Sequence, residues 1–241
     1  PPADPNLMEL LVFADAARRA GAASITAVVP YFAYARQDSR HGRREPVSAR
    51  LAADLIRTAG VDRIILVDPH SPQLEGFFRI PVQVLTGLPA LCADLRGRLP
   101  PDTTVVSPDS GRVALAARYA RCLDAPLSIL HKHRESGSET HVTHLVGEVA
   151  GRTCLIIDDM VSTGGTLRDG AARLLAAGAR ECRAAVTHGL FIGDALDRLH
   201  AAGIHDIVVS DSVPPPAPPP PGLRVVSLAP TLAAATRAPG R

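Results

Sequence analysis

The chain has 241 residues, of which 46% are hydrophobic and 21% charged, so it can bury a core and is not a disordered tail. At about 100–200 residues per domain, this length indicates one large domain or two modest ones. The net charge of +2 argues against a protein whose main role is to coat DNA or RNA. Aromatic residues make up only 3%, so stacking platforms for single-stranded nucleic acid are not expected.

Cysteine usage and hydropathy indicate a cytoplasmic protein. The four cysteines lie far apart without a CxxC pair, which is too sparse for a disulfide framework or a zinc site, so we expect reduced and mostly buried thiols. No apolar run reaches the about 18 residues of a membrane span. The start, PPADPNLMELL, is not a signal peptide, and the missing initiator Met indicates a processed or partial chain.

Short apolar runs alternate with helical patterns along the chain. Helical spacing is seen first at residues 7–14, then around 47–55, 111–123, 166–177 and 194–202. Buried strands are predicted at residues 25–29, 64–67, 104–106, 154–157, 184–186 and 207–209. This alternation is typical of parallel strands joined by crossover helices. In such folds ligands bind beyond the carboxyl ends of the strands.

A proline-rich segment, PPPAPPPP, occupies residues 214–221. Polyproline is stiff and extended and cannot join a sheet. It could serve as an SH3-type ligand, but the sequence favours a spacer that carries the chain to its last elements. These are a strand near Val225 and a helix near residues 230–237.

The strongest chemical signal is the segment LIIDDMVSTGGTL, residues 155–167. An apolar strand ends in Asp158 and Asp159, and a short loop from Ser162 to Thr166 leads into a helix. Glycines let backbone N–H groups crowd around an oxyanion, and the helix N-terminus adds a favourable dipole. The loop is not a P-loop, because it lacks Gly-Lys-Ser/Thr. A phosphate cradle beside carboxylates that accept from vicinal hydroxyls describes a site for a ribose phosphate.

The segment DDMVSTGGTL resembles the phosphoribosyl-binding loop of the type I phosphoribosyltransferase fold. Further segments, in the same order along nearly the whole chain, are similar to the ribose-phosphate pyrophosphokinases, also called phosphoribosyl-pyrophosphate synthetases. These segments are NLMELLVFADAARRAGAASITAVVPYFAYARQD from Asn6, VDPHSPQLEGFF from Val67, VVSPDSG from Val105, HKHRESG from His131 and THGLF from Thr187.

The resemblance implies an enzyme that transfers the β,γ-diphosphoryl group of ATP to the 1-hydroxyl of ribose 5-phosphate, releasing AMP and requiring Mg²⁺.

The resemblance also implies an α/β fold of two similar lobes with mainly parallel sheets. We place a first, N-terminally incomplete lobe at residues 1–87 and a second, phosphoribosyltransferase-like lobe at 88–213, followed by the spacer 214–221 and a terminal strand and helix at 222–241. It also implies a homo-oligomer, in the family a hexamer built from dimers, and no nucleic-acid or membrane partner.

The resemblance also assigns roles to residues of this chain. Asp158 and Asp159 match the positions that hold the ribose hydroxyls, and Lys132 and Arg134 are the expected catalytic pair in a lid-like loop from His131 to Glu139, with Arg134 also touching ribose 5-phosphate. The remaining expected contacts are Ser162, Thr163, Gly164, Gly165 and Thr166 for the 5-phosphate, Arg36, Gln37 and His70 for ATP, and His70 and Asp109 for the metal. Taken without the resemblance, Asp109 could equally be a turn residue and His70 a structural histidine.

The sequence departs from the family pattern in three places. Ser162 stands where bacterial members more often have Asp, and Arg112 stands where members usually have Gly. The segment that family members carry ahead of the part matching Asn6 is missing. Three readings therefore stay open: a partial or mis-assigned form of an active synthetase, a catalytically weak or regulatory synthetase-like subunit, or another phosphoribosyltransferase.

Overall fold

The computed structural model describes residues 2–40, 42, 44–134 and 141–237, with the side chains of residues 132–134 and 141–143 not described. Contacts divide the chain into two compact units. The first contains the chain up to Thr86 together with helix α7 (Ala229–Arg237), and the second runs from Gly87 to Leu228. No helix in the described ranges combines the length and apolar character needed to cross a membrane.

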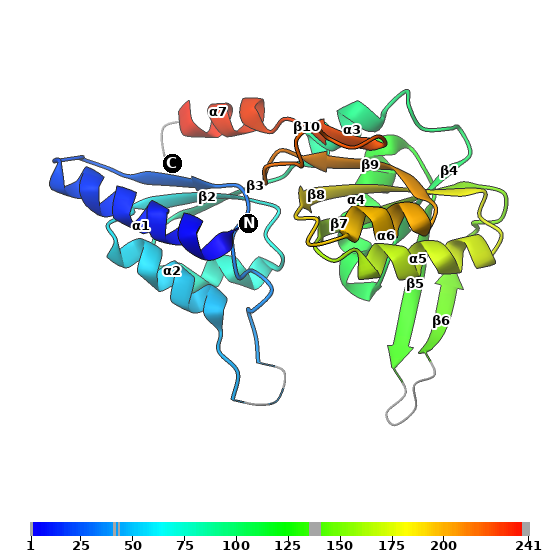
Figure 1. The fold of residues 1–241 in the computed structure, drawn as a ribbon, viewed down its shortest axis with the longest axis horizontal. Helices are drawn as coiled ribbons and strands as arrows, with labels where there is room; N and C mark the ends of the chain where they lie inside the picture. The colour runs from blue at the N-terminus through cyan, green and yellow to red at the C-terminus, as the bar shows by residue number, and fades with distance from the viewer. Residues whose placement is uncertain (1, 41, 43, 135–140, 238–241) are drawn as a thin grey trace. The chain divides into compact units, whose positions relative to one another are not determined.

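The first unit is built on a three-stranded parallel sheet in the order β1-β2-β3, on which α1 and α2 pack (Figure 1). Its elements are α1 (Ala3–Arg19), β1 (Thr26–Val29), α2 (Ser48–Thr58), β2 (Arg63–Val67), a 3₁₀ turn η1 (Pro72–Phe77) and β3 (Val82–Leu85). Alanines at 49, 52 and 53 on the buried face of α2 let the helix lie close to the sheet. The core is completed by Ile56, Ile64 and Leu66.

The second unit has a seven-stranded sheet in the order β10-β9-β8-β7-β4-β5-β6. All neighbouring strands are parallel except the β5–β6 pair, which is antiparallel. The strands are β4 (Thr103–Ser107), β5 (Leu127–Arg134), β6 (His141–Val146), β7 (Thr153–Val161), β8 (Glu181–Gly189), β9 (Ile204–Ser210) and β10 (Leu223–Val226). The helices are α3 (Leu88–Leu95), η2 (Ser110–Arg112, 3₁₀), α4 (Val113–Leu123), α5 (Gly165–Ala176) and α6 (Ala195–Ala201).

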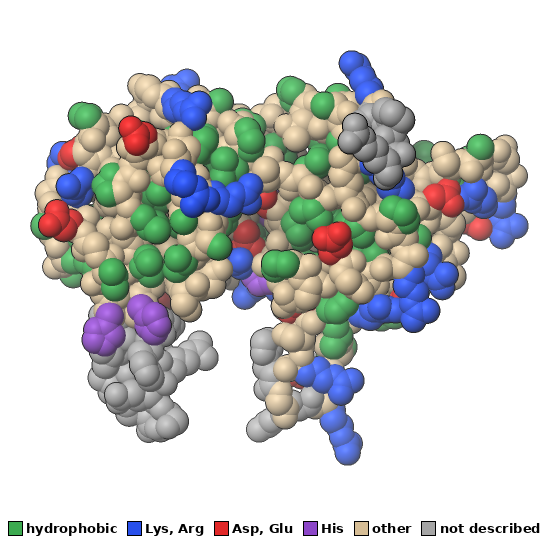
Figure 2. Space-filling view, turned by 180° about the vertical axis from the view of Figure 1, so that it is seen from behind, with side chains coloured by type: hydrophobic (Ala, Val, Ile, Leu, Met, Phe, Trp, Pro, Cys, Tyr) green, Lys and Arg blue, Asp and Glu red, His purple; other side chains and the backbone are tan. Residues whose placement is uncertain are grey.

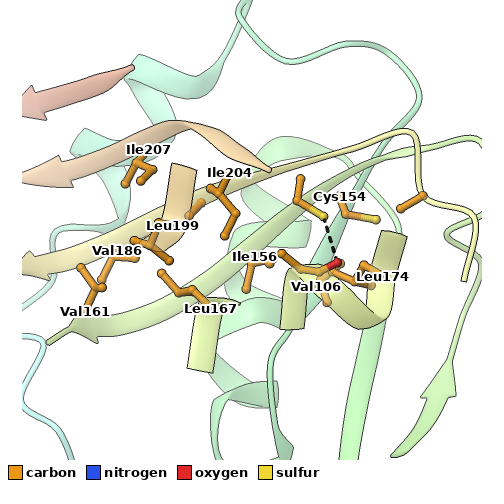
Figure 3. Packing of buried hydrophobic residues seen from close by; sticks show 14 of the residues in the cluster. Val106, Cys154, Ile156, Val161, Leu167, Leu174, Val186, Leu199, Ile204 and Ile207 are labelled. Carbon is orange, nitrogen blue, oxygen red and sulfur yellow. Dashed lines mark hydrogen bonds between the residues drawn. The ribbon is translucent and has the colours of Figure 1, made fainter. Parts of the chain in front are cut away.

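Helices cover both faces of this sheet, which explains the unbroken apolar run of its central strand. In β7, Cys154 and Ile156 join the cluster that contains α5 and α6 residues, whereas Leu155 and Ile157 join the cluster that contains α3 and α4 residues. Alternate strand residues point to opposite faces, so a strand buried on both sides needs apolar residues throughout. Figure 3 shows the first of these clusters, with Leu167 and Leu174 of α5 and Leu199 of α6 packed on the strands.

The expected α/β fold with mainly parallel sheets is confirmed, but some local expectations differ from the structure. Strand β3 and helix α3 were not predicted. Residues 131–134 continue β5 and pair with β6, rather than forming a loop from His131, and residues 135–140 lie outside the described ranges. Of the terminal strand and helix at 222–241, strand β10 pairs with β9 in the second unit. Helix α7 groups with the first unit, which agrees with the expectation that the last helix returns to the first lobe. The prolines at 214–221 join β9 to β10 without adding a strand.

Candidate active site

The loop from Ser162 to Thr166 is held at both ends by the core of the second unit. Val161, the last residue of β7, is 2% exposed, and Leu167 in the first turn of α5 is 1% exposed. Both side chains lie in the cluster drawn in Figure 3. The loop between them is therefore short and fixed, which suits a site that presents backbone N–H groups in one direction.

Glycine is favoured at two positions of this loop, 164 and 165, for different physical reasons. Gly164 has φ +78°, and a Cβ there would lie 3.2 Å from the Leu199 Cγ atom, so both the backbone conformation and the packing favour glycine. Gly165 has no left-handed conformation, and the nearest atom to a Cβ would be Thr163 Oγ1 at 4.0 Å. The protein itself therefore leaves open space at Gly165, over the start of α5, as a phosphate cradle requires.

Polar groups surround that open space. The side chains of Thr163 and Thr166 are exposed, Ser162 is half-buried, and α5 begins at Gly165. The first N–H groups of a helix have no partner within the helix, and with the helix dipole they favour an anion. These hydroxyls and N–H groups can together bind a phosphate, and the structure brings all five predicted cradle residues into one turn.

The two predicted ribose-binding carboxylates lie at the end of β7, directly before this loop. Asp158 and Asp159 are 7% and 4% exposed. The backbone N–H of Asp159 donates to Asp158 Oδ1 at 2.9 Å. Burial raises the pKa of Asp158 well above its usual range, and the neighbouring Asp159 carboxyl raises it further, while Arg112 opposes the rise. Two like charges in a buried place need a counter-ion.

Arg112 supplies that counter-ion, a contact that the sequence did not reveal. Its Nε lies 3.1 Å from Asp158 Oδ1, and its Nη2 lies 3.1 Å from Asp159 Oδ1. Consecutive strand residues ordinarily point to opposite faces, yet one guanidinium contacts both carboxylates. The departure from glycine at this position therefore touches the predicted ribose site directly.

Asp109 closes a turn at the end of the neighbouring strand. Its Oδ1 accepts hydrogen bonds from the N–H groups of Gly111 at 2.8 Å and of Arg112 at 3.1 Å. This is the turn role that we held open beside the metal role. Among the described residues no group donates to its second oxygen, Oδ2. Carboxylate oxygens suit Mg²⁺, which keeps several waters and takes few protein ligands, so this oxygen fits the expected ion.

No group of three or more His, Cys, Asp or Glu side chains in the described ranges is arranged to hold a metal ion. His70, the other expected metal residue, lies in the first unit and is half-buried, while Asp109 lies in the second. Each of the two residues is therefore described within its own unit.

The predicted ATP contacts gather in loops of the first unit. Arg36 and Gln37 are exposed in the loop after β1, and His70 lies in the loop after β2. Asp38 connects the two loops, because its Oδ2 accepts from Ser71 Oγ at 2.5 Å and from Gln73 Nε2 at 3.3 Å. Asp68 has φ +37°, an unusual conformation for a residue other than glycine, at the point where the chain leaves β2 toward His70. Sequence reasoning missed Asp38, because only the fold brings the loops together.

Lys132 and Arg134 lie on β5, where their backbones pair with Thr143 and His141 of β6. Their side chains are outside the described part of the structure. The hairpin rises from the same end of the sheet as the loop after β4, because β5 is the parallel neighbour of β4. His188, in the THGLF segment, is 1% exposed on β8, and its Nδ1 lies 2.8 Å from Ser212 Oγ.

Charged groups elsewhere on the surface are mixed. Figure 2 shows basic side chains in several separate places on the face turned to the viewer, with acidic and apolar side chains between them.

Comparison with known proteins agrees with this geometry. A family model for the N-terminal domain of ribose phosphate pyrophosphokinase matches residues 1–60, and a phosphoribosyl transferase domain model matches residues 97–210. A ribose-phosphate pyrophosphokinase of Streptomyces avermitilis is 46% identical over 235 residues, which cover 96% of this chain and 72% of that protein. The chain belongs to the ribose-phosphate pyrophosphokinase family.

Other members are similar to the same extent. The ribose-phosphate pyrophosphokinase of Chromobacterium violaceum is 44% identical over 239 residues, covering 98% of this chain and 73% of the relative. The crystal structure of phosphoribosylpyrophosphate synthetase from Mycobacterium smegmatis superposes with a TM-score of 0.88 at 42% identity, covering 96% of this chain and 76% of that one. The predicted family is therefore confirmed, and with it the class of enzyme.

Proposed function

We propose that this chain carries out the diphosphoryl transfer of its family, from ATP to the 1-hydroxyl of ribose 5-phosphate, with AMP as the second product. The proposal depends on the order of elements from β7 through the loop to α5. In this order, two buried carboxylates directly precede an open anion cradle. In a member of this enzyme family, that pairing matches the hydroxyls and the phosphate of one ribose 5-phosphate molecule.

The roles of the second unit follow from donor and acceptor chemistry. The cradle, Ser162 to Thr166, binds the 5-phosphate through hydroxyl and backbone donors. Asp158 and Asp159 accept from the ribose hydroxyls and so orient the sugar. The 1-hydroxyl oxygen then forms a bond to the β-phosphorus of ATP, while the bond from that phosphorus to the α–β bridging oxygen breaks. The proton of the 1-hydroxyl is released to water, and AMP leaves with the bridging oxygen.

Positively charged groups must balance the negative charge of the diphosphoryl group during its transfer. Phosphoryl transfer is mostly positioning and electrostatic stabilisation. We assign Lys132 to the charge that grows on the diphosphoryl group and Arg134 to the bound substrates, on the strength of their match to the family segment from His131. In the first unit, Arg36, Gln37 and His70 are assigned to ATP.

Mg²⁺ is the expected ion, with Asp109 and His70 as its protein-side groups. When bound, it neutralises charge on the phosphates of ATP. The unengaged Oδ2 of Asp109 supports this assignment for Asp109, whereas His70 rests on the family match alone. We further propose that the protein works in the cytoplasm as a homo-oligomer.

The proposal is tested by an assay of AMP release from ATP, run on this chain and on an N-terminally extended form. We expect AMP release that depends on ribose 5-phosphate, and a loss of about 10²-fold or more in Asp158→Asn. Asp169→Asn is the matched control, because Asp169 lies on α5 outside the cradle and pairs with Arg168. AMP release that ignores ribose 5-phosphate, or none from the extended form, contradicts the proposal and favours a passive subunit.

A further inference from the structure

The most specific feature of this site is the guanidinium that contacts both buried carboxylates. The Arg112 side chain is 18% exposed, and those of Asp158 and Asp159 are 9% and 5% exposed. Both ion pairs measure 3.1 Å. A fork that engages two shielded carboxylates at once is a built arrangement rather than a chance surface pair.

The order of the strands and the turn after β4 place Arg112 beside the two carboxylates. β4 and β7 are neighbouring parallel strands, so their carboxyl ends lie at the same edge of the sheet. The Asp109 carboxylate caps the turn η2 that follows β4 and accepts from the backbone N–H of Arg112. The side chain then reaches across from this turn to the end of β7.

Arginine and a ribose diol require the same acceptors. A guanidinium carries only N–H donors, and a vicinal diol binds carboxylates by donating two O–H groups. Asp158 Oδ1 already accepts from Arg112 Nε and from the Asp159 backbone N–H. The oxygens that the guanidinium contacts are Asp158 Oδ1 and Asp159 Oδ1, so a diol that donates to these two atoms competes with it.

We propose that Arg112 is an internal competitor of the ribose hydroxyls, which neutralises Asp158 and Asp159 until a vicinal diol displaces it. The inference rests on the assignment of these carboxylates to ribose 5-phosphate under Proposed function. The cost of displacing Arg112 therefore falls on a vicinal diol, because a sugar phosphate with a single hydroxyl at this place cannot replace both contacts of the fork and leaves it in position.

The effect of Arg112 on ribose 5-phosphate binding should also depend on pH, because Arg112 and the two carboxylates are charged. The charged groups that face Asp158 are Asp159 from the same strand and Arg112 from η2. On the neighbouring strand β8, the buried His188 is held by Ser212. Without the guanidinium the carboxyl pair keeps a proton to higher pH, because Arg112 opposes the raised pKa of Asp158. Removal of Arg112 should then help binding mainly in alkaline solution.

The test is calorimetric binding of ribose 5-phosphate, 2-deoxyribose 5-phosphate and inorganic phosphate to the parent and to Arg112→Met. In alkaline solution we expect Arg112→Met to bind ribose 5-phosphate about tenfold more tightly, the change that about one charge-assisted hydrogen bond gives. The gain should be less than about twofold for the deoxy sugar and absent for phosphate, and it should shrink as the pH is lowered. Arg168→Met, on the exposed side of α5, is the control.

Two outcomes would overturn the proposal that Arg112 competes with the diol. One is that Arg112→Met binds ribose 5-phosphate equally or more weakly than the parent in alkaline solution. The other is that it gains affinity equally for both sugars. If Arg112→Met does not fold, Arg112→Lys keeps the charge without the fork, and it must show a smaller gain with the same preference for ribose 5-phosphate. A parent protein that binds none of the sugar phosphates contradicts instead the assignment of the cradle. A parent that binds ribose 5-phosphate no more weakly than the Arg112 variants contradicts the competitor alone.

Discussion

The carboxylate of Asp38 accepts a hydrogen bond from the Ser71 hydroxyl at 2.5 Å and thereby ties the loop after β1 to the loop after β2. Arg36 and Gln37 directly precede Asp38, and His70 directly precedes Ser71. This contact therefore links the two loops that carry the three residues we assign to ATP.

Replacing Asp38 with Ala should weaken ATP binding without affecting ribose 5-phosphate. A hydrogen bond to a charged group contributes about 1.5–3 kcal/mol, so we expect the KM for ATP to rise by about 10-fold or more. The measurement is a set of initial rates against each substrate. Asp15→Ala serves as control, because Asp15 is exposed on α1 and pairs only with Arg19. An unchanged KM for ATP would show that the loops are held by other contacts.

Gly165→Val should abolish the cradle while leaving the fold intact. The space at Gly165 is open within the protein, so the new side chain fills the place of the phosphate rather than the core. We expect ribose 5-phosphate to bind about 100-fold more weakly, corresponding to about 3 kcal/mol. Gly170→Ala on the same helix meets only ordinary contacts, at 3.6 Å from Leu130 and 3.8 Å from Ile156, and should bind normally. Equal binding by both variants would refute the cradle.

Stability should depend on pH through Asp158. Its pKa in the folded protein is raised above the ordinary value of 3.8, so the folded state binds more protons than the unfolded state above that value. Stability from this group is therefore present at low pH and is lost as the pH rises through the raised pKa. The free energy of unfolding of the parent should fall relative to Asp158→Asn as pH rises from about 4. Denaturant titrations that show a constant difference would contradict the raised pKa.

The four thiols should react unequally with a disulfide reagent. Burial raises the pKa of Cys154 to about 11 and those of Cys92 and Cys182 to about 12. Cys122 is half-buried, and its Sγ lies 3.5 Å from Arg96 Nη2. Near neutral pH we expect Cys122 to react fast in the folded protein and the other three only after unfolding. Fast labelling that survives Cys122→Ser would contradict this ranking.

The cradle could be predicted from sequence because its determinants are local. Apolar residues from Leu155 to Ile157, the carboxylates after them and the paired glycines all lie within one strand, loop and helix. The central strands were predictable for the same reason, since a strand buried on both faces shows a continuous apolar run.

The features that were missed depend on contacts between distant segments. Helix α3 is an exception, because Pro89 in its first turn, where proline is tolerated, is a local signal of a helix start. Strand extension at Lys132 is stabilised by pairing with β6, which residue types alone do not show. The contact of Arg112 with Asp158 spans 46 positions, and it exists only because β4 and β7 are neighbours.

The central claim, transfer of a diphosphoryl group, is tested most directly by identifying the products of a reaction of ATP with ribose 5-phosphate. Phosphorus NMR of the mixture distinguishes a diphosphoryl from a single phosphoryl transfer. The account predicts AMP and phosphoribosyl pyrophosphate in equal amounts, and about 100-fold slower formation of both by Gly165→Val when ribose 5-phosphate is not saturating. ADP with a ribose bisphosphate, or AMP without a diphosphorylated sugar, would contradict it.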